Sequence, residues 1–234
     1  MGNPVLRGEL RARSTSRKIL VIQIFYLAVL GLLTFLGLPP ELTQTETSRQ
    51  AGLVLALLAV QVVLLTYFAS ACAIQEIAVE GEKTAVDLIF APFTPAAIVT
   101  GKSLASLITI LYWLLLGAPL VMLAARIRQE PLDDIIGVTA FIAIAAWGIT
   151  QIGTLYSILV EPEFSRVLAH WGTLLAIFVG TLVLPAPARL INPVVTVARA
   201  AGGGIPWMAC LGYAALGVVC DYLAGVSLRR FAAT

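Results

Sequence analysis

Six long apolar stretches, each close to the length that crosses a lipid bilayer, make up most of this chain. A membrane-spanning helix needs roughly 20 mostly apolar residues. The 234 residues are 59% hydrophobic and only 12% charged, which is too little charge for the surface of a water-soluble protein. The sequence therefore predicts an all-α integral membrane protein with six transmembrane helices. We expect these spans at about residues 19–38, 51–73, 103–125, 135–160, 167–187 and 206–228.

The distribution of basic residues predicts the orientation of the spans. Lys and Arg are retained on the cytoplasmic side of a membrane when the connecting loops are short. If both termini are cytoplasmic, ten of the Lys and Arg residues fall in inner segments and five in outer ones. We therefore expect a multi-pass protein of a plasma (inner) membrane with both termini in the cytoplasm. Because the basic residues are scattered or juxtamembrane, they indicate contact with membrane lipid and not with nucleic acid.

The polar segments outside the spans predict two short extra helices. Residues 1–18 are basic with leucines on one side, which is typical of a cytoplasmic interfacial helix, and residues 19–234 form the six-helix transmembrane domain. Between the fifth and sixth spans, Asn192 is a suitable N-cap and Pro193 a suitable first-turn residue. We expect a short outer helix there, in a re-entrant or interfacial hairpin.

The longest polar break lies between the second and third spans, and it predicts an amphipathic helix. Four charged residues recur there at i, i+4, i+7 and i+11, which places them on one stripe of a helix. These residues are Glu76, Glu80, Lys83 and Asp87. We expect a helix over about 74–91 that lies parallel to the membrane with its acidic side toward the cytosol. Pro92 and Pro95 prevent this helix from continuing into the third span.

This break resembles the signature of the ABC-2 type transporter permeases. The matching strings are E-G-E-K, V-D-L-I and A-P-F-T-P-A-A-I-V-T-G-K, followed by an apolar run that ends in G-A-P. Glu80 and Glu82 match the paired glutamates of that signature, Pro92 matches one of its prolines, and Gly101-Lys102 matches the pair that opens its third helix. Thr84-Ala85 departs from the Gly-Thr that the family usually has.

Two further segments carry the same resemblance. Asn3-Pro4 with Glu9-Leu10-Arg11 is similar to the family's N-terminal interfacial helix, and Asn192-Pro193 is similar to a pair before its last span. The resemblance implies the membrane subunit of an exporter, which forms a homodimer or heterodimer and pairs with separate ABC-type ATPase subunits. It implies that the amphipathic helix is a coupling helix seated in a cleft of the ATPase. The residues expected to couple to the ATPase are Glu76, Glu80, Glu82, Lys83, Asp87, Pro92, Gly101 and Lys102.

The chain itself is not expected to be an enzyme or to hold a cofactor, so ATP and Mg²⁺ would belong to the partner subunit. Gly101-Lys102-Ser103 is similar to the end of a phosphate loop, but Ala96 stands where that loop needs glycine. The three cysteines fall inside predicted spans, lack C-x-x-C spacing and are accompanied by a single histidine, which argues against a zinc site.

Polar residues inside the spans are candidates for a translocation path or a dimer interface. They are Gln23, Gln61, Gln151 and Asp221. Hydrogen bonding to a neighbouring helix explains the glutamines equally well, and contact with water or an arginine would explain Asp221. For His170, beside Trp171, an interfacial anchor is the favoured interpretation.

Other classes of membrane protein remain as alternatives. A heme-export-like permease of cytochrome assembly would also be a six-span partner of an ATPase. An ion-coupled secondary transporter usually carries an internal repeat, and none is evident in this sequence. An intramembrane hydrolase would need two convergent catalytic groups at depth, which one aspartate and one histidine far apart in the chain do not readily supply. The sequence does not specify the cargo.

Overall fold

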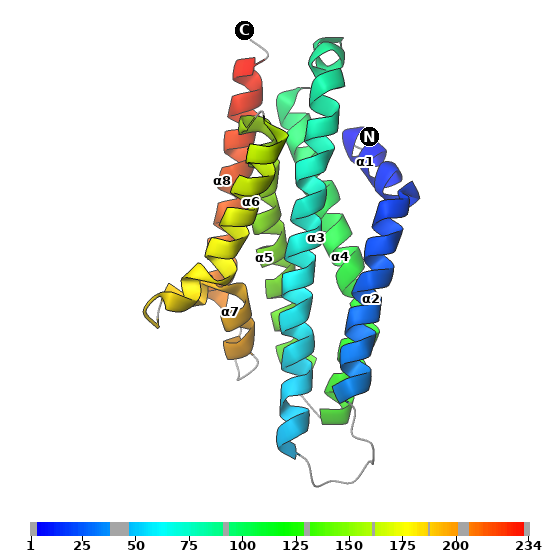
Figure 1. Cartoon of the computed structure of the whole chain (residues 1–234), viewed down its shortest axis with the longest axis vertical. Coiled ribbons are helices and arrows are strands. Elements are labelled where there is room, and N and C mark those ends of the chain that lie inside the picture. The colour runs from blue at the N-terminus through cyan, green and yellow to red at the C-terminus, as the bar shows by residue number, and fades with distance from the viewer. Residues whose placement is uncertain are drawn as a thin grey trace.

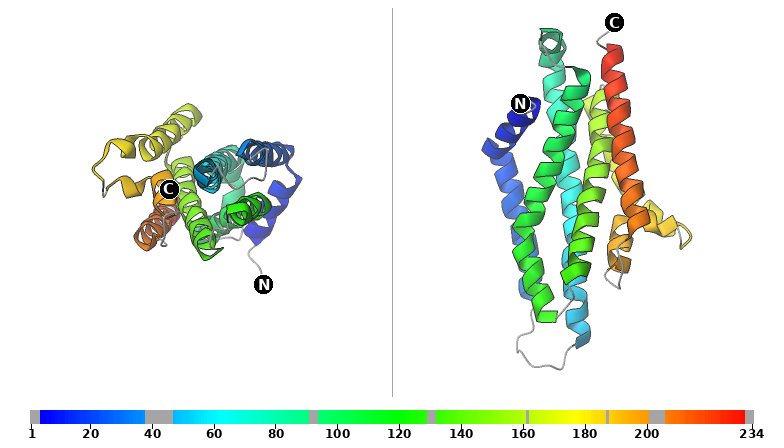
Figure 2. Two further views of the ribbon diagram at one scale, coloured as in Figure 1. Left: turned by 90° about the horizontal axis from the view of Figure 1, so that it is seen from below. Right: turned by 180° about the vertical axis from the view of Figure 1, so that it is seen from behind.

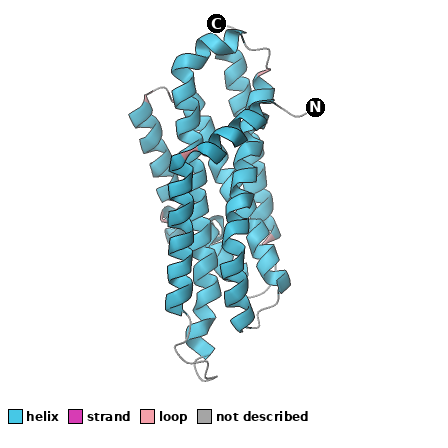
Figure 3. Cartoon of the chain, turned by 90° about the vertical axis from the view of Figure 1, so that its right-hand side faces the viewer, coloured by secondary structure: helices cyan, strands magenta, loops and turns pink. Residues whose placement is uncertain are grey.

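The structure is a computed structural model, and it describes residues 4–37, 47–90, 94–128, 132–160, 162–186, 188–200 and 206–231. Side chains are described for these residues except 4, 47–51, 75–90, 95, 128 and 231. The described residues form helices and connecting loops and contain no strand (Figure 3).

Six helices are long and apolar enough to cross a membrane, as predicted. They run roughly side by side as one elongated bundle (Figure 1). Their bounds are α2 (Arg17–Gly37), α3 (Thr47–Phe90), α4 (Pro95–Arg128), α5 (Leu132–Leu159), α6 (Glu163–Phe178) with its continuation η1 (Gly180–Val183), and α8 (Trp207–Phe231). Most boundaries fall within a few residues of the predicted ones. The exceptions are α3, which runs beyond its apolar part, the N-terminal end of α4, and α6, whose helix begins four residues before the predicted span.

The central helix of the bundle is α5, which packs against α3 on one side and α8 on the other (Figure 2). Its most apolar window is 72% buried inside the protein, compared with 22% for α2 and for α6. Small residues allow this close packing, because α5 carries glycine and alanine along most of its length. The outward faces of α2 and α8 instead expose large apolar side chains, as expected of surfaces that contact lipid or another subunit.

Two glycines permit the close approach of α5 and α8. A Cβ at Gly148 would collide with the backbone carbonyl oxygen of Tyr213. A Cβ at Gly217 would come within 2.5 Å of the ring of Trp147. Interhelical contacts of this kind are characteristic of membrane bundles, where small residues let helix backbones pack closely.

Replacing Gly148 with alanine is expected to lower the free energy of unfolding by about 1–3 kcal/mol, the typical cost of overpacking. The obstacle is the backbone of Tyr213, which can move only if the two helices separate. Titration of the purified protein with sodium dodecyl sulfate, followed by circular dichroism, measures the change. Gly212→Ala is the matched control, because nothing lies within 4 Å of a Cβ at that position. Equal stability of the two variants would contradict the close packing.

Two short helices accompany the spans. Helix α1 (Pro4–Thr15) lies at the same end of the bundle as both termini and is inclined to α2 (Figures 1 and 2). Helix α7 (Pro193–Ala200) packs against α3 and α5. Two 3₁₀ turns, η1 and η2 (Ala188–Ile191), connect α6 to α7.

The predicted N-cap of α7 is confirmed. The side-chain oxygen of Asn192 accepts hydrogen bonds from the backbone N–H groups of Val194 (2.9 Å) and Val195 (3.3 Å). Its amide nitrogen donates to the carbonyl oxygen of Phe178 at 2.7 Å, so the same residue ties α7 to the end of α6.

The helix predicted over about 74–91 does not begin where the sequence analysis placed it. Residues up to Phe90 are helical, but they continue α3 without a break from Thr47. The physical reason is that no proline occurs between Thr47 and Phe90, and Gly81 alone does not end a helix. The charge of Glu76 and its neighbours therefore marks a change of environment along one helix and not a helix boundary.

Candidate functional site

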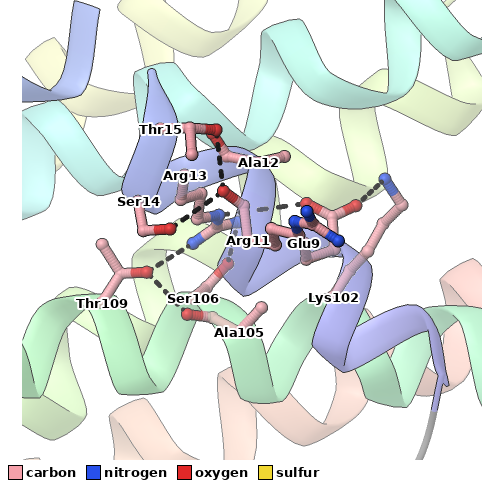
Figure 4. A network of polar contacts seen from close by, with 10 residues as sticks. All are labelled: Glu9, Arg11, Ala12, Arg13, Ser14, Thr15, Lys102, Ala105, Ser106 and Thr109. Carbon is pink, nitrogen blue, oxygen red and sulfur yellow. Dashed lines mark hydrogen bonds and ion pairs between the residues drawn. The ribbon is translucent and has the colours of Figure 1, made fainter. Parts of the chain in front are cut away.

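A buried ion pair joins α1 to the N-terminal part of α4. The Lys102 ammonium donates to Glu9 Oε1 at 2.7 Å (Figure 4). Both residues are buried, with 9% of Glu9 and 7% of Lys102 exposed. Charged side chains are rarely buried without such a partner, so the pair determines which face of α1 lies against α4.

Arg13 extends this contact by one turn of α1. Its guanidinium donates to Thr109 Oγ1 at 2.8 Å and to Ser106 Oγ at 3.3 Å, and its Nε lies 3.9 Å from Glu9 Oε2. Figure 4 shows Glu9 and Arg13 projecting from α1 toward the polar side chains of α4. We refer to Glu9, Arg13, Lys102, Ser106 and Thr109 as the α1–α4 network.

The α1–α4 network was missed by the sequence analysis, although each half of it has helical spacing. Glu9 and Arg13 are four residues apart, and Lys102 is followed by Ser106 and Thr109 at i+4 and i+7. These two short polar stripes could have indicated that α1 and α4 each have a polar face. The sequence does not show that they face each other across 93 residues of chain.

A second polar cluster lies where α4, α5 and α8 meet. Asp221 Oδ2 accepts a hydrogen bond from Ser103 Oγ at 2.7 Å. Gln151 satisfies both of its neighbours when its amide nitrogen donates to Asp221 Oδ1 and its amide oxygen accepts from Trp147 Nε1, each at 2.9 Å. The indole N–H also lies 3.1 Å from Ser103 Oγ. We call these four residues the Asp221 cluster.

The Asp221 cluster brings together two of the four residues predicted for a path or interface. No basic side chain among the described residues forms an ion pair with Asp221, so the arginine contact considered for it is not what holds it. Its partners are neutral donors from two neighbouring spans. Ser103, next to Lys102 in sequence, bonds to α8, whereas Lys102 bonds to α1.

The other two predicted residues lie elsewhere in the bundle. Gln61 is 2% exposed, and its amide nitrogen donates to Tyr26 Oη at 2.8 Å, which joins α3 to α2. Gly117 of α4 makes room for this bond, since a Cβ there would lie 2.5 Å from Tyr26 Oη. Gln23 is partly exposed on α2. Bonding to a neighbouring helix, the alternative for the glutamines, is thus confirmed for Gln61 and Gln151.

His170 is buried inside the bundle and is not an exposed anchor. Only 3% of it is exposed, and its Nε2 lies 3.0 Å from Ser70 Oγ, which connects α6 to α3. Arg166, one turn earlier on the same buried face, donates from Nε to the carbonyl oxygen of Val160 at 2.9 Å. Trp171 is 50% exposed and packs against Tyr67 with the rings tilted and their centroids 5.1 Å apart, so the aromatic neighbour has the exposed position instead.

The residues expected to couple to an ATPase are only partly placed. Five of them belong to the C-terminal part of α3, for which the structure describes the backbone and not the side chains. These five residues are Glu76, Glu80, Glu82, Lys83 and Asp87. Pro92 also lies outside the described residues. Gly101 and Lys102 are in the second turn of α4 and are buried. The Lys102 charge is directed at Glu9 of the same chain.

Within the part of the chain that the structure describes, no group of three His, Cys, Asp or Glu residues is arranged to hold a metal ion. All three cysteines are free thiols. No protein-family model matches the chain, and no curated protein matches it.

Proposed function

We propose that this chain is the transmembrane permease subunit of an ATP-driven exporter of the ABC-2 type, working as a dimer with separate ATPase subunits. One observation carries most of the proposal. Glu9-Leu10-Arg11 and Gly101-Lys102 are both parts of the family resemblance, and the Glu9 and Lys102 side chains of these two segments form a buried ion pair. If the two segments that carry the resemblance serve one structural role, we expect their side chains to be in contact, and this ion pair is such a contact.

The proposed mechanism uses α1, α3 and α4 as one mechanical unit. Helix α1 lies on the inner leaflet, and the acidic stripe near the end of α3 contacts basic groups of the ATPase. When ATP binding draws two ATPase subunits together, the C-terminal end of α3 and the N-terminal end of α4 move. The α1–α4 network transmits this motion to α1, because a buried ion pair with flanking hydrogen bonds resists sliding of the two helices.

The proposed translocation path lies between two permease subunits. Gln61 and Gln151 are 2% and 0% exposed, so they stabilise the bundle of one subunit and do not face the path. Gln23 and Asp221 are partly exposed and are the two predicted residues that remain available to it. Helix α7 belongs to the proposed outer hairpin, on the side of the membrane opposite the ATPase.

Co-purification tests the ATPase partnership. The affinity-tagged chain is extracted from its native membranes in a mild nonionic detergent, and the proteins that accompany it are identified by mass spectrometry. We expect a second subunit with a complete phosphate loop and vanadate-sensitive ATP hydrolysis in the purified complex. A chain that purifies alone and transports in response to an ion gradient would contradict the proposal.

Cysteine labelling tests the orientation. In a variant whose three native cysteines are replaced by alanine, a single cysteine is introduced as Glu82→Cys or, in the loop between the first two spans, as Gln44→Cys. A membrane-impermeant maleimide added to intact cells is expected to label only the Gln44→Cys variant. The Glu82→Cys variant should react only after the membrane is opened. Labelling of the Glu82→Cys variant from outside would place the acidic stripe on the wrong side for an ATPase.

A further inference from the structure

Four basic side chains are exposed on α1 and at the start of α2. They are Arg7, Arg11, Arg17 and Lys18. Among the described residues, no acidic side chain forms an ion pair with any of them. The one acidic residue of α1 is Glu9, which is buried and bonded to α4. The exposed charges of this segment are therefore all positive.

The α1–α4 network decides which way these charges face. Along a helix, a residue two positions away lies on nearly the opposite side. Arg7 and Arg11 flank Glu9 in this way, so the burial of Glu9 against α4 turns both arginines away from the bundle. The network also removes Arg13 from the exposed surface, because its guanidinium bonds to hydroxyl groups of α4. Helix α1 itself lies at the edge of the bundle (Figure 2).

The exposed charges lie where the apolar surface of α2 begins. Leu20 and Val21 are 56% and 62% exposed, and they follow Lys18 directly along the helix. The separation corresponds to roughly 3–5 Å of helix rise. Side chains that face hydrocarbon thus give way at once to side chains that carry positive charge, as happens at the level of phospholipid headgroups. An acidic protein bound from the cytosol would not account for this continuity with the apolar surface.

From this arrangement we infer that Arg7, Arg11, Arg17 and Lys18 bind the phosphate groups of anionic phospholipids, and that the chain selects these lipids over zwitterionic ones. Guanidinium groups donate two parallel hydrogen bonds to a phosphate, and lysine supplies a point charge. A zwitterionic headgroup carries its own cation, which cancels most of this attraction. The inference rests on the proposed function only in placing α1 on the inner leaflet, where anionic lipids are concentrated.

Native mass spectrometry tests this selectivity. The purified chain in nonionic micelles receives equimolar phosphatidylglycerol and phosphatidylcholine, one of them deuterated, and the bound lipids are counted by mass. We expect the wild-type chain to retain phosphatidylglycerol on the order of tenfold more, since one basic residue near an anionic lipid contributes roughly a fivefold preference. In Arg7→Gln/Arg11→Gln and in Arg17→Gln/Lys18→Gln the ratio should fall to about threefold or less.

A matched control removes the same amount of charge from another part of the surface. Arg126→Gln/Arg199→Gln takes exposed arginines from the end of α4 and from α7, and it should keep the wild-type ratio. The exposed carboxylate of Asp133, at the start of α5, already offsets part of the positive charge in that region. Because every substituted side chain is exposed, each double variant should fold like the wild type.

Three results would overturn the assignment. The first is equal retention of the two lipids by the wild-type chain, which would leave an acidic protein as the partner of this surface. The second is a ratio that stays at the wild-type value in both test variants, or that falls as far in the control. The third is displacement of phosphatidylglycerol by glycerol 3-phosphate, because the headgroup alone would then suffice. Since no ATPase is present, these results leave the ATPase partnership to the co-purification experiment.

Discussion

Replacing Lys102 with methionine is expected to loosen α1 from α4 and to lower the free energy of unfolding by about 3 kcal/mol. The Glu9 carboxylate would remain buried while it loses the ammonium at 2.7 Å, and the ion pair left to it among the described residues would be the longer one to Arg13 Nε at 3.9 Å. Hydrogen exchange measured by mass spectrometry on peptides from α1 should become at least tenfold faster. Titration with sodium dodecyl sulfate gives the change in the free energy of unfolding.

A double-mutant cycle separates this pair from its surroundings. Glu9→Gln alone should cost a similar amount, because it leaves the Lys102 charge buried. The double variant Glu9→Gln/Lys102→Met should recover most of the loss, since neither charge remains, and the coupling free energy should exceed about 1 kcal/mol. Lys18→Met is the matched control, because this lysine is exposed at the start of α2. Additive single effects with unchanged exchange in α1 would show that the ion pair does not hold the two helices together.

Reversing the charges of Glu80 and Glu82 to lysine is expected to abolish transport and cargo-stimulated ATP hydrolysis. If the acidic stripe of α3 contacts basic groups of an ATPase, two reversed charges replace attraction by repulsion, which costs several kcal/mol at an interface. Transport is measured in reconstituted vesicles, and insertion of the variant is checked by its extraction and its helical circular dichroism.

The control for this experiment reverses two glutamates on the opposite side of the membrane. Glu41 and Glu46 lie in the loop between the first two spans, and their replacement by lysine should leave coupling to the ATPase intact. Transport at the wild-type rate in the Glu80→Lys/Glu82→Lys variant would contradict the proposal that the acidic stripe of α3 contacts the ATPase. It would not affect the α1–α4 network, which is tested separately by hydrogen exchange.

Features that depend on residues near in sequence were predicted well. The six spans are runs of apolar residues, and the cap of α7 depends on Asn192 and the next three residues. The start of the helix predicted at about 74 was wrong for an informative reason. A change from apolar to charged residues indicates where a helix leaves the membrane. The helix itself ends only where a helix-breaking residue such as proline occurs.

Features that depend on how helices face one another were not predictable in the same way. His170 could be placed near one end of a span, but its burial against Ser70 depends on the rotation of α6 relative to α3. In the same way, Gln151 and Asp221 were recognised as polar residues inside spans, whereas their meeting through Ser103 and Trp147 was not.

By itself the sequence determined the number and position of the membrane spans, because burying about 20 apolar residues in lipid is a property of a single segment. Only the tertiary structure decided that Glu9 meets Lys102 and that Asp221 meets Ser103, across 93 and 118 residues of chain. These contacts depend on the relative rotation and spacing of packed helices, which close packing of small and large side chains determines and hydropathy does not encode.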